Sequence, residues 1–516
     1  MRGSGQRLHV QPEQKRRRAV IPGTRHSDQA AEAVMTREAT TEGIYGALRA
    51  LFPLSPGAAP RTWTRRGMAA IAQIAAVGLG AGVLLLRIPG LPAWDAVYAE
   101  DYWEFLLGAY QHPWRIFVPF GGYEQFLQRV VAQFVAYLPI ADADYAFAAV
   151  GALITAGCAL FIFHASSGHI RSVPLRVLLA AAVILLSSAP MEIADSTVAV
   201  SFYLLLAMFW AALWRPRTPA GMATAAIVAF VTAASTSIVI LFAPLLAIRV
   251  IVLRRFSEHA VTAGWLAGCL IQLPIVLVAY ATGQSRLTGY GPSAGSNNRL
   301  GDSLTFYAHD VVLRAIGWHL SWRLEALTGR DWATAIVAVA LVAVFAVIMT
   351  TQPGTRPIVV TALLTGFVFS MVSTILTPWV TAWPVTIQQE SAARYTALPI
   401  FLIEAAVIIG VDYALRKRRG VREGDKPGHW YARTGLRAAL AVTALVVILA
   451  TSWAVDFRYT GIRTVGYSSR WSLKVDQFRN GCRNSPSGEI RVNGPTDGSF
   501  LPVPSRYEIP CARIRL

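Results

Sequence analysis

Residues 68–86 read MAAIAQIAAVGLGAGVLLL, and the loop at 94–129 that follows reads WDAVYAEDYWEFLLGAYQHPWRIFVPFGGYEQFLQR. The first stretch is apolar over nearly the length that an α-helix needs to cross a bilayer, about 20 residues. The second gathers acidic residues (Asp95, Glu100, Asp101, Glu104 and Glu124) among aromatic ones (Trp94, Tyr98, Tyr102, Trp103, Tyr110 and Trp114). We interpret the first stretch as a membrane span and the second as a loop that contains functional residues.

The composition of the 516 residues indicates a membrane protein, because 54% are hydrophobic and only 15% are charged. Soluble domains carry about 25% charged residues. The net charge of +18 is explained by Lys and Arg, which collect at the cytoplasmic ends of membrane spans. The sequence contains no Cys–His cluster, phosphate-binding loop or dinucleotide motif, and we expect no nucleic-acid partner. It predicts an all-α, polytopic protein of the plasma membrane that contacts membrane lipids.

Basic residues set the predicted topology. Arg61, Arg65 and Arg66 precede the first span, which places the N-terminus in the cytoplasm and the loop 88–144 outside. Further spans are expected at 145–164, 175–189, 197–214, 261–281, 332–349, 358–376, 396–415 and 436–453, with two short ones inside 219–253. The total is about 11 transmembrane helices. The strongest cytoplasmic signal is RKRRGVREGDK, directly after the tenth span.

Three regions follow from this reading. Residues 1–67 are basic and poor in large apolar residues, so they are predicted to be a disordered cytoplasmic tail. Residues 68–454 form the transmembrane domain. In its outside loop 282–331, the amphipathic part 304–327 is expected to lie in the membrane interface with Trp318 and Trp322 as anchors. Residues 455–516 form a small extracytoplasmic C-terminal segment.

The four cysteines fall into two pairs. Cys158 and Cys269 lie in apolar spans and are expected to be core residues. Cys482 and Cys511 lie in the C-terminal segment, which the topology places in an oxidising compartment where disulfides persist. We therefore expect a disulfide between Cys482 and Cys511.

Two short motifs contain the candidate catalytic and phosphate-binding residues. A carboxylate just outside a membrane can act as a general base toward an acceptor hydroxyl, which makes Glu100 and Asp101 candidates. Neighbouring helical residues point in different directions, so one of the two is expected to face a site, and the sequence leaves open which. Arg394 and Tyr395 lie where the chain re-enters the membrane, and an Arg there can hold a phosphate.

These motifs resemble the GT-C superfamily of integral-membrane glycosyltransferases. Its members have many spans and an acidic motif, commonly DD, DE or ED, in the first extracytoplasmic loop, matched here by Glu100-Asp101. The stretch FGGYEQFLQRVVAQFVAYLP at 120–139 carries a GY-xxx-L-x-R-xx-A pattern similar to the segment after that motif. Arg394-Tyr395 resembles the family's RY element. The resemblance covers the architecture of residues 68–415.

The resemblance implies that a hexosyl or pentosyl group moves from a polyprenyl-phosphate donor to a glycan, lipid or protein acceptor of the cell envelope. Asp101 or Glu100 would activate the acceptor, while Arg394 and Arg129 would bind the donor phosphate. The residues that would shape the sugar site are Tyr102, Trp103, Tyr123 and Tyr395. Some relatives use a divalent cation, Mg²⁺ or Mn²⁺, for which the sequence assigns no ligands.

Two other classes compete with this reading. A transporter or lipid flippase should carry ionisable residues within its spans, whereas here the predicted spans hold almost none apart from Glu404 and Asp412 in the tenth. A non-catalytic protein of cell-envelope assembly is the other alternative. Such a scaffold should tolerate substitution of Asp101, whereas an enzyme that uses it should not.

Overall fold

The computed structural model describes residues 45–56, 63–87, 95, 97, 101–120, 122–186, 197, 199–282, 299–376, 393–421, 443, 447–457, 470–485, 487–493 and 506–514. Residues from Leu48 to the end of the chain form one compact unit. The described part of this unit is almost entirely helical, with one two-stranded sheet near its end. Most of the predicted disordered tail, the loop at 377–392 and the start of the eleventh span lie outside the described residues.

Six helices of the described chain are long and apolar enough to cross a membrane. They are α2 (Trp63–Leu85), α5 (Ala143–Ala165), α11 (Ala260–Ala281), α15 (Arg330–Thr351), α16 (Arg356–Leu376) and α19 (Ala393–Val421). Large apolar side chains such as Ile71, Leu270 and Val339 are exposed on three of them. Their exposure suits a hydrocarbon surrounding, which solvates an apolar side chain as well as a protein core does.

Several shorter apolar helices lie between these spans. They are α4 (Phe126–Val135), α6 (Val173–Ile184), α8 (Val200–Leu213), α9 (Pro219–Ser235) and α10 (Ala243–Val252), which the 3₁₀ turn η5 (Ser237–Phe242) precedes. At 1.5 Å per residue, each is shorter than the hydrocarbon core of about 30 Å. The predicted split of 219–253 into two helices is present, with Thr236 extended between them. Within the described residues, six helices are therefore long enough for full spans, against about 11 predicted for the whole sequence.

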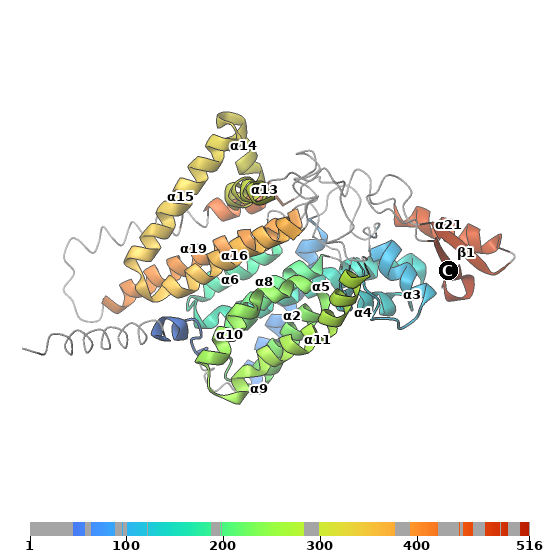
Figure 1. The fold of residues 1–516 in the computed structure, drawn as a ribbon, viewed down its shortest axis with the longest axis horizontal. Coiled ribbons are helices and arrows are strands. Elements are labelled where there is room, and N and C mark those ends of the chain that lie inside the picture. Colours follow the sequence, from blue (N-terminus) through green and yellow to red (C-terminus); the bar gives the residue numbers. More distant parts are fainter. Residues whose placement is uncertain are drawn as a thin grey trace, which may run out of the picture. The chain divides into compact units, whose positions relative to one another are not determined.

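Glycines bring α9 and α11 into close contact, and Figure 1 shows the two helices side by side. A Cβ atom on Gly264 would overlap the carbonyl oxygen of Ala226, and one on Gly268 would meet Ala233 and Phe230. Small residues four apart allow two helix backbones to approach in this way. The helices α16 and α19 also lie side by side, where Gly366 faces Pro399.

Charged side chains from distant parts of the chain bind both ends of α6. Asp412 of α19 accepts hydrogen bonds from the backbone N–H groups of Arg171 (3.1 Å) and Ser172 (2.8 Å), just before the helix begins. At the other end, Arg87 donates to the carbonyls of Ile184 (2.6 Å) and Leu186 (3.0 Å). Because helix termini leave backbone groups unpaired, these bonds fix α6 against the helices α2 and α19. Asp412, one of the two acids noted in the tenth span, is thus a helix cap.

The amphipathic part of the predicted loop 282–331 forms α13 (Arg299–Phe306), the π-helical turn η7 (Tyr307–Val312), the 3₁₀ turn η8 (Leu313–Ile316) and α14 (Trp318–Thr328). The prediction that Trp318 anchors it to the interface is wrong, because this side chain is buried with Arg314 over its ring. Asp456, near the end of the described stretch 447–457, accepts from the N–H groups of Trp318 and His319 and so caps α14.

The C-terminal segment packs against the loop at 94–129. It contains α21 (Trp471–Arg483), an antiparallel pair of strands, β1 (Glu489–Asn493) and β2 (Arg506–Pro510), and the turn η11 (Cys511–Arg513). Its buried residues share one hydrophobic core with η2 (Asp101–Leu106), α3 (Leu107–Gln111) and α4. The expected disulfide between Cys482 and Cys511 is present, with a Cα–Cα distance of 5.6 Å.

The prediction of a disordered tail at 1–67 is wrong for its last part. Leu51 and Phe52 are buried, and the backbone N–H of Ser55 donates to the carbonyl of Arg215 at 3.3 Å. The indole of Trp214 donates to the Ser55 hydroxyl at 2.8 Å. These contacts hold the segment before α2 against the end of α8.

Candidate functional site

Asp101 begins η2, and its side chain is almost completely buried, with 1% exposed. One carboxylate oxygen accepts a hydrogen bond from the backbone N–H of Thr197 at 2.9 Å, and the other accepts from the Thr197 hydroxyl. Thr197 lies three residues before the first residue of α8, Val200. Asp101 therefore joins the described part of the loop at 94–129, which we call the acidic segment, to the N-terminal end of α8.

The start of α19 lies against the same end of α8. The ring centres of Tyr395 and Phe202, the third residue of α8, are 6.0 Å apart. The guanidinium carbon of Arg394 lies 5.6 Å from the ring centre of Tyr395. Both sequence motifs, Asp101 and Arg394-Tyr395, thus lie at the N-terminal end of α8, which we call the acidic end.

Arg129 of α4 forms an ion pair inside the protein. Its Nη2 lies 2.7 Å from a carboxylate oxygen of Glu104, and its Nε lies 3.9 Å from one of Glu124. The guanidinium also lies over the ring of Phe105, at 5.4 Å, and only 6% of the side chain is exposed. The Glu104 carboxylate therefore pairs with the charge of Arg129 inside the protein. In this structure Arg129 holds Glu104 and α4 together, and the phosphate-binding role that the resemblance implies stays a prediction.

Glu124 is the most unusual group of this cluster. Its side chain is fully buried, and neither carboxylate oxygen has a hydrogen-bond partner among the described residues. Burial raises the pKa of Glu124 to about 8, because an apolar surrounding disfavours the charged form. The positive charge of Arg129 and the nearby N–H of Gln125 act in the opposite direction. The carboxyl group therefore carries its proton near neutral pH.

The backbone at Glu124 is anchored to two apolar helices. Gln272 of α11 accepts from the Glu124 N–H at 3.0 Å and donates to the Glu124 carbonyl at 2.6 Å. The hydroxyl of Ser235, the last residue of α9, accepts from the N–H of Leu127 at 3.1 Å. These bonds position the start of α4, and with it Arg129, relative to the helix bundle.

The aromatic residues assigned to a sugar site have different surroundings. Tyr102 packs edge-on against Trp471 and Phe478 of α21, at 5.5 and 6.3 Å, and lies under Lys474. Tyr102 thus contacts the C-terminal segment, and its expected sugar-binding role stays a prediction. The hydroxyl of Tyr123 accepts from the side chain of Gln125 at 3.2 Å. Glu100 and the side chain of Trp103 lie outside the described residues.

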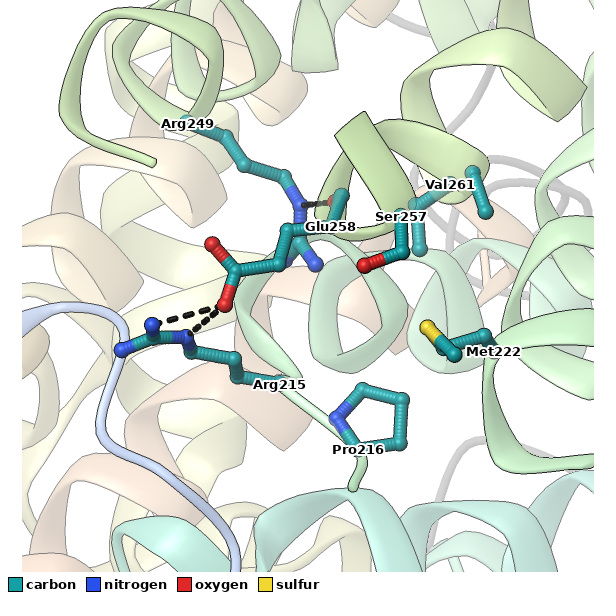
Figure 2. Close-up of a pocket in the computed structure, with 8 residues that line it drawn as sticks. Arg215, Pro216, Met222, Arg249, Ser257, Glu258 and Val261 are labelled. Atoms are coloured by element: carbon teal, nitrogen blue, oxygen red, sulfur yellow. Dashed lines mark hydrogen bonds and ion pairs between the residues drawn. The ribbon is translucent and has the colours of Figure 1, made fainter. Parts of the chain in front are cut away.

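A separate small cavity lies between η6 (Phe256–His259) and the ends of α8 and α10. Figure 2 shows Arg215 and Arg249 converging on Glu258, and two side-chain nitrogens of Arg215 lie 2.7 Å from one Glu258 oxygen. Arg249 donates to the Glu258 carbonyl at 3.0 Å. The free space of about 10 Å³ holds about one water molecule. This cluster is a structural ion pair, too small to accept a substrate.

The described residues contain no group of three or more His, Cys, Asp or Glu side chains placed to hold a metal ion. Comparison with known proteins adds no assignment: no protein-family model matches the chain, and no curated protein matches its sequence. The functional interpretation therefore depends on the residues at the acidic end and on the contacts between them.

Proposed function

We propose that this chain is a membrane glycosyltransferase that acts at the outer face of the plasma membrane, with a cytoplasmic N-terminus and an extracytoplasmic C-terminal segment. It transfers a hexosyl or pentosyl group from a polyprenyl-phosphate donor to a hydroxyl group of a cell-envelope acceptor. The observation that carries the proposal is the position of Asp101 and Arg394-Tyr395 at one end of α8.

The proposed chemistry needs a base and a cation at this end. Asp101 or Glu100 accepts the proton of the acceptor hydroxyl, whose oxygen bonds to the anomeric carbon of the sugar. The bond from that carbon to the phosphate oxygen breaks, and polyprenyl phosphate leaves with the electron pair. Arg394 stabilises the negative charge that develops on the phosphate. A carboxylate base and a phosphate repel each other, and a cation between them reduces this repulsion.

Transfer assays in membranes test the proposal. Membranes that contain the protein are supplied with synthetic polyprenyl-phosphate hexoses and pentoses, and incorporation of labelled sugar is measured. Loss of a general base costs ~10²–10⁴-fold in rate, so Asp101→Asn or Glu100→Gln should lower transfer by that factor. Arg394→Ala should raise the donor concentration needed for half-maximal rate. Asp142→Asn, at an exposed carboxylate of η3 (Ile140–Asp142), is the matched control.

The variant Thr197→Val tests whether the Thr197 hydroxyl positions the Asp101 carboxylate for proton transfer. The valine is nearly isosteric and removes only the hydroxyl that donates to Asp101. If the carboxylate acts as the base, this variant should lose part of the rate, because the hydroxyl no longer holds the carboxylate in position. Full transfer by Asp101→Asn, Glu100→Gln and the double variant would refute the glycosyltransferase proposal.

One observation favours a second function, transport of a lipid or another solute. Glu404 lies within the candidate span Arg394–Arg416, is 6% exposed, and one of its oxygens has no hydrogen-bond partner among the described residues. Buried ionisable groups in membrane spans are costly and often mark transport pathways. In a transporter, Glu404→Gln should abolish activity and Asp101→Asn should leave it intact, the reverse of the result expected for the transferase.

A further inference from the structure

The outward side of helix α4 is apolar, unlike that of a helix on a water-facing surface. Its buried side carries the polar Gln128, Arg129 and Gln133 beside the apolar Val131, Ala132 and Val135. Phe126 and Val130 are half-buried, and Phe134 is 61% exposed. Residues four apart lie on one face of a helix, so positions 126, 130 and 134 form an outward apolar stripe. Helices at a water-facing surface put their polar residues on that side.

Other large aromatic residues extend this stripe. Trp114, Phe117 and Tyr137 are each about half exposed. The Trp114 ring lies 5.9 Å from Phe134, and its indole N–H donates to the Tyr137 hydroxyl at 2.9 Å. Phe117 stacks on Phe126 at 6.1 Å. We call the outward set Trp114, Phe117, Phe126, Phe134 and Tyr137 the aromatic surface.

The protein holds the aromatic surface in place from behind. The backbone of Trp114 has a φ of 62°, a left-handed conformation that is uncommon for residues other than glycine. The side-chain oxygen of the buried Gln133 accepts a hydrogen bond from the Trp114 N–H at 2.7 Å. A strained conformation persists where the surroundings determine it. The exposed position of this indole is therefore a fixed feature of the fold.

The aromatic surface adjoins α9, a helix that packs along the candidate membrane span α11. Phe126 contacts Phe230 of α9 at 5.9 Å, and α9 packs along α11 (Figure 1). Along α11, Leu266, Leu270, Leu273 and Leu277 are all exposed. The apolar outward side of α4 and its contact with α9 both point to lipid as the medium on the outward side.

We infer that the aromatic surface lies in the interface of the lipid bilayer, a role that does not depend on the proposed reaction. Trp and Tyr prefer the headgroup level, because one part of each ring system is apolar and the other donates hydrogen bonds. Phe117, Phe126 and Phe134 contact the upper acyl chains. The bilayer thereby sets the depth of α4 and of the Glu104–Arg129–Glu124 cluster behind it.

Spin-label accessibility in proteoliposomes of phosphatidylethanolamine and phosphatidylglycerol tests this inference. Single cysteines replace Phe117 or Phe134 in a background with Cys158→Ala and Cys269→Ala, which keeps the Cys482–Cys511 disulfide. Leu270→Cys on α11 is the lipid-facing reference, and Gln477→Cys on α21, which is exposed, is the water-facing one. Molecular oxygen concentrates in acyl chains, whereas a nickel chelate stays in water.

The inference predicts that labels at 117 and 134 collide with oxygen more than with nickel, close to the values at 270. Nickel accessibility like that at 477 would overturn it and show a water-facing surface. Low accessibility to both reagents would also overturn it, because a protein partner would then cover the surface. As a second measurement, brominated lipids should quench the fluorescence of the native protein more than that of Trp114→Phe; equal quenching would count against the inference.

Discussion

Gly264 of α11 lies so close to Ala226 of α9 that a Cβ atom at position 264 would overlap the Ala226 carbonyl oxygen. Four residues further along, Gly268 makes a second close approach, to Ala233 and Phe230. The two glycines therefore fix the distance between α9 and α11. The backbone of Glu124 depends on this distance, because it binds Gln272 on α11 while Leu127 binds Ser235 on α9.

The first prediction concerns this helix pair. Gly264→Ala should force α9 and α11 apart and lower the free energy of unfolding by about 1–3 kcal/mol, the usual cost of overpacking. Gly78→Ala and Gly82→Ala in α2 are matched controls, since a Cβ atom there meets nothing within 4 Å. Thermal unfolding in detergent measures the difference. Equal melting temperatures for the 264 and 78 variants would contradict the close packing.

The second prediction is a pH dependence caused by Glu124. Its pKa rises from 4.5 in the unfolded chain to about 8 in the folded protein. Between these values the folded protein binds more protons, so its stability falls as the pH rises from 4.5 through 8. The loss is on the order of a few kcal/mol, because each pKa unit corresponds to about 1.4 kcal/mol.

Glu124→Gln removes the titrating group and should abolish this part of the pH dependence. Melting temperatures from pH 5 to pH 9 should fall more steeply for the native protein than for the variant, and the variant should be the more stable one above pH 8. Parallel curves for the two proteins would show that Glu124 does not carry a buried proton.

The third prediction concerns the cap of α6. Asp412→Ala removes the acceptor for two backbone N–H groups and the ion-pair partner of Arg416, whose Nε lies 2.9 Å away. We expect a loss of about 2–3 kcal/mol of stability, since hydrogen bonds to charged groups are the stronger ones. Asp142→Ala, at an exposed carboxylate, should change stability little. A transport role for Asp412 would instead leave stability intact and alter only activity.

The fourth prediction concerns the disulfide, which joins residues 29 positions apart. In the chain-entropy model, closing a loop of this length stabilises the segment by about 3.5 kcal/mol. Replacing Cys482 and Cys511 by Ser should speed hydrogen exchange in α21 and both strands. Exchange in η2 should rise as well, because Tyr102 packs on Trp471. Unchanged exchange in η2 would show that it folds independently of the C-terminal segment.

The sequence predicted the long helices well, since apolar length is a local signal. The predicted span 261–281 corresponds to α11 (Ala260–Ala281), and 358–376 to α16 (Arg356–Leu376). The burial of Phe52 has a different origin, because its segment is held by contacts with Trp214 and Arg215. No local pattern indicates partners that lie so far away along the chain.

The candidate site was predicted only in part, because some of its contacts also join residues that lie far apart along the chain. The motifs marked Asp101 and Arg394, and both lie at the acidic end. The contacts of Tyr102 with Trp471 and of Arg129 with Glu104 were not predicted, because these residues become neighbours only through folding. A signal for Glu124 did exist in the sequence: polar residues at 124, 125, 128, 129 and 133 share an otherwise apolar stretch.

The end of the chain completes the core around the acidic segment, and this affects the timing of assembly. Arg513 donates to the carbonyl of Tyr110 across 403 residues of sequence. At ~5–20 residues per second, ribosomes need roughly 20–80 s to synthesise that length. During this interval Tyr102 and its neighbours lack their final packing partners. The acidic segment is thus synthesised early but reaches its packed form late, only after the C-terminal segment that contains Arg513 has been made.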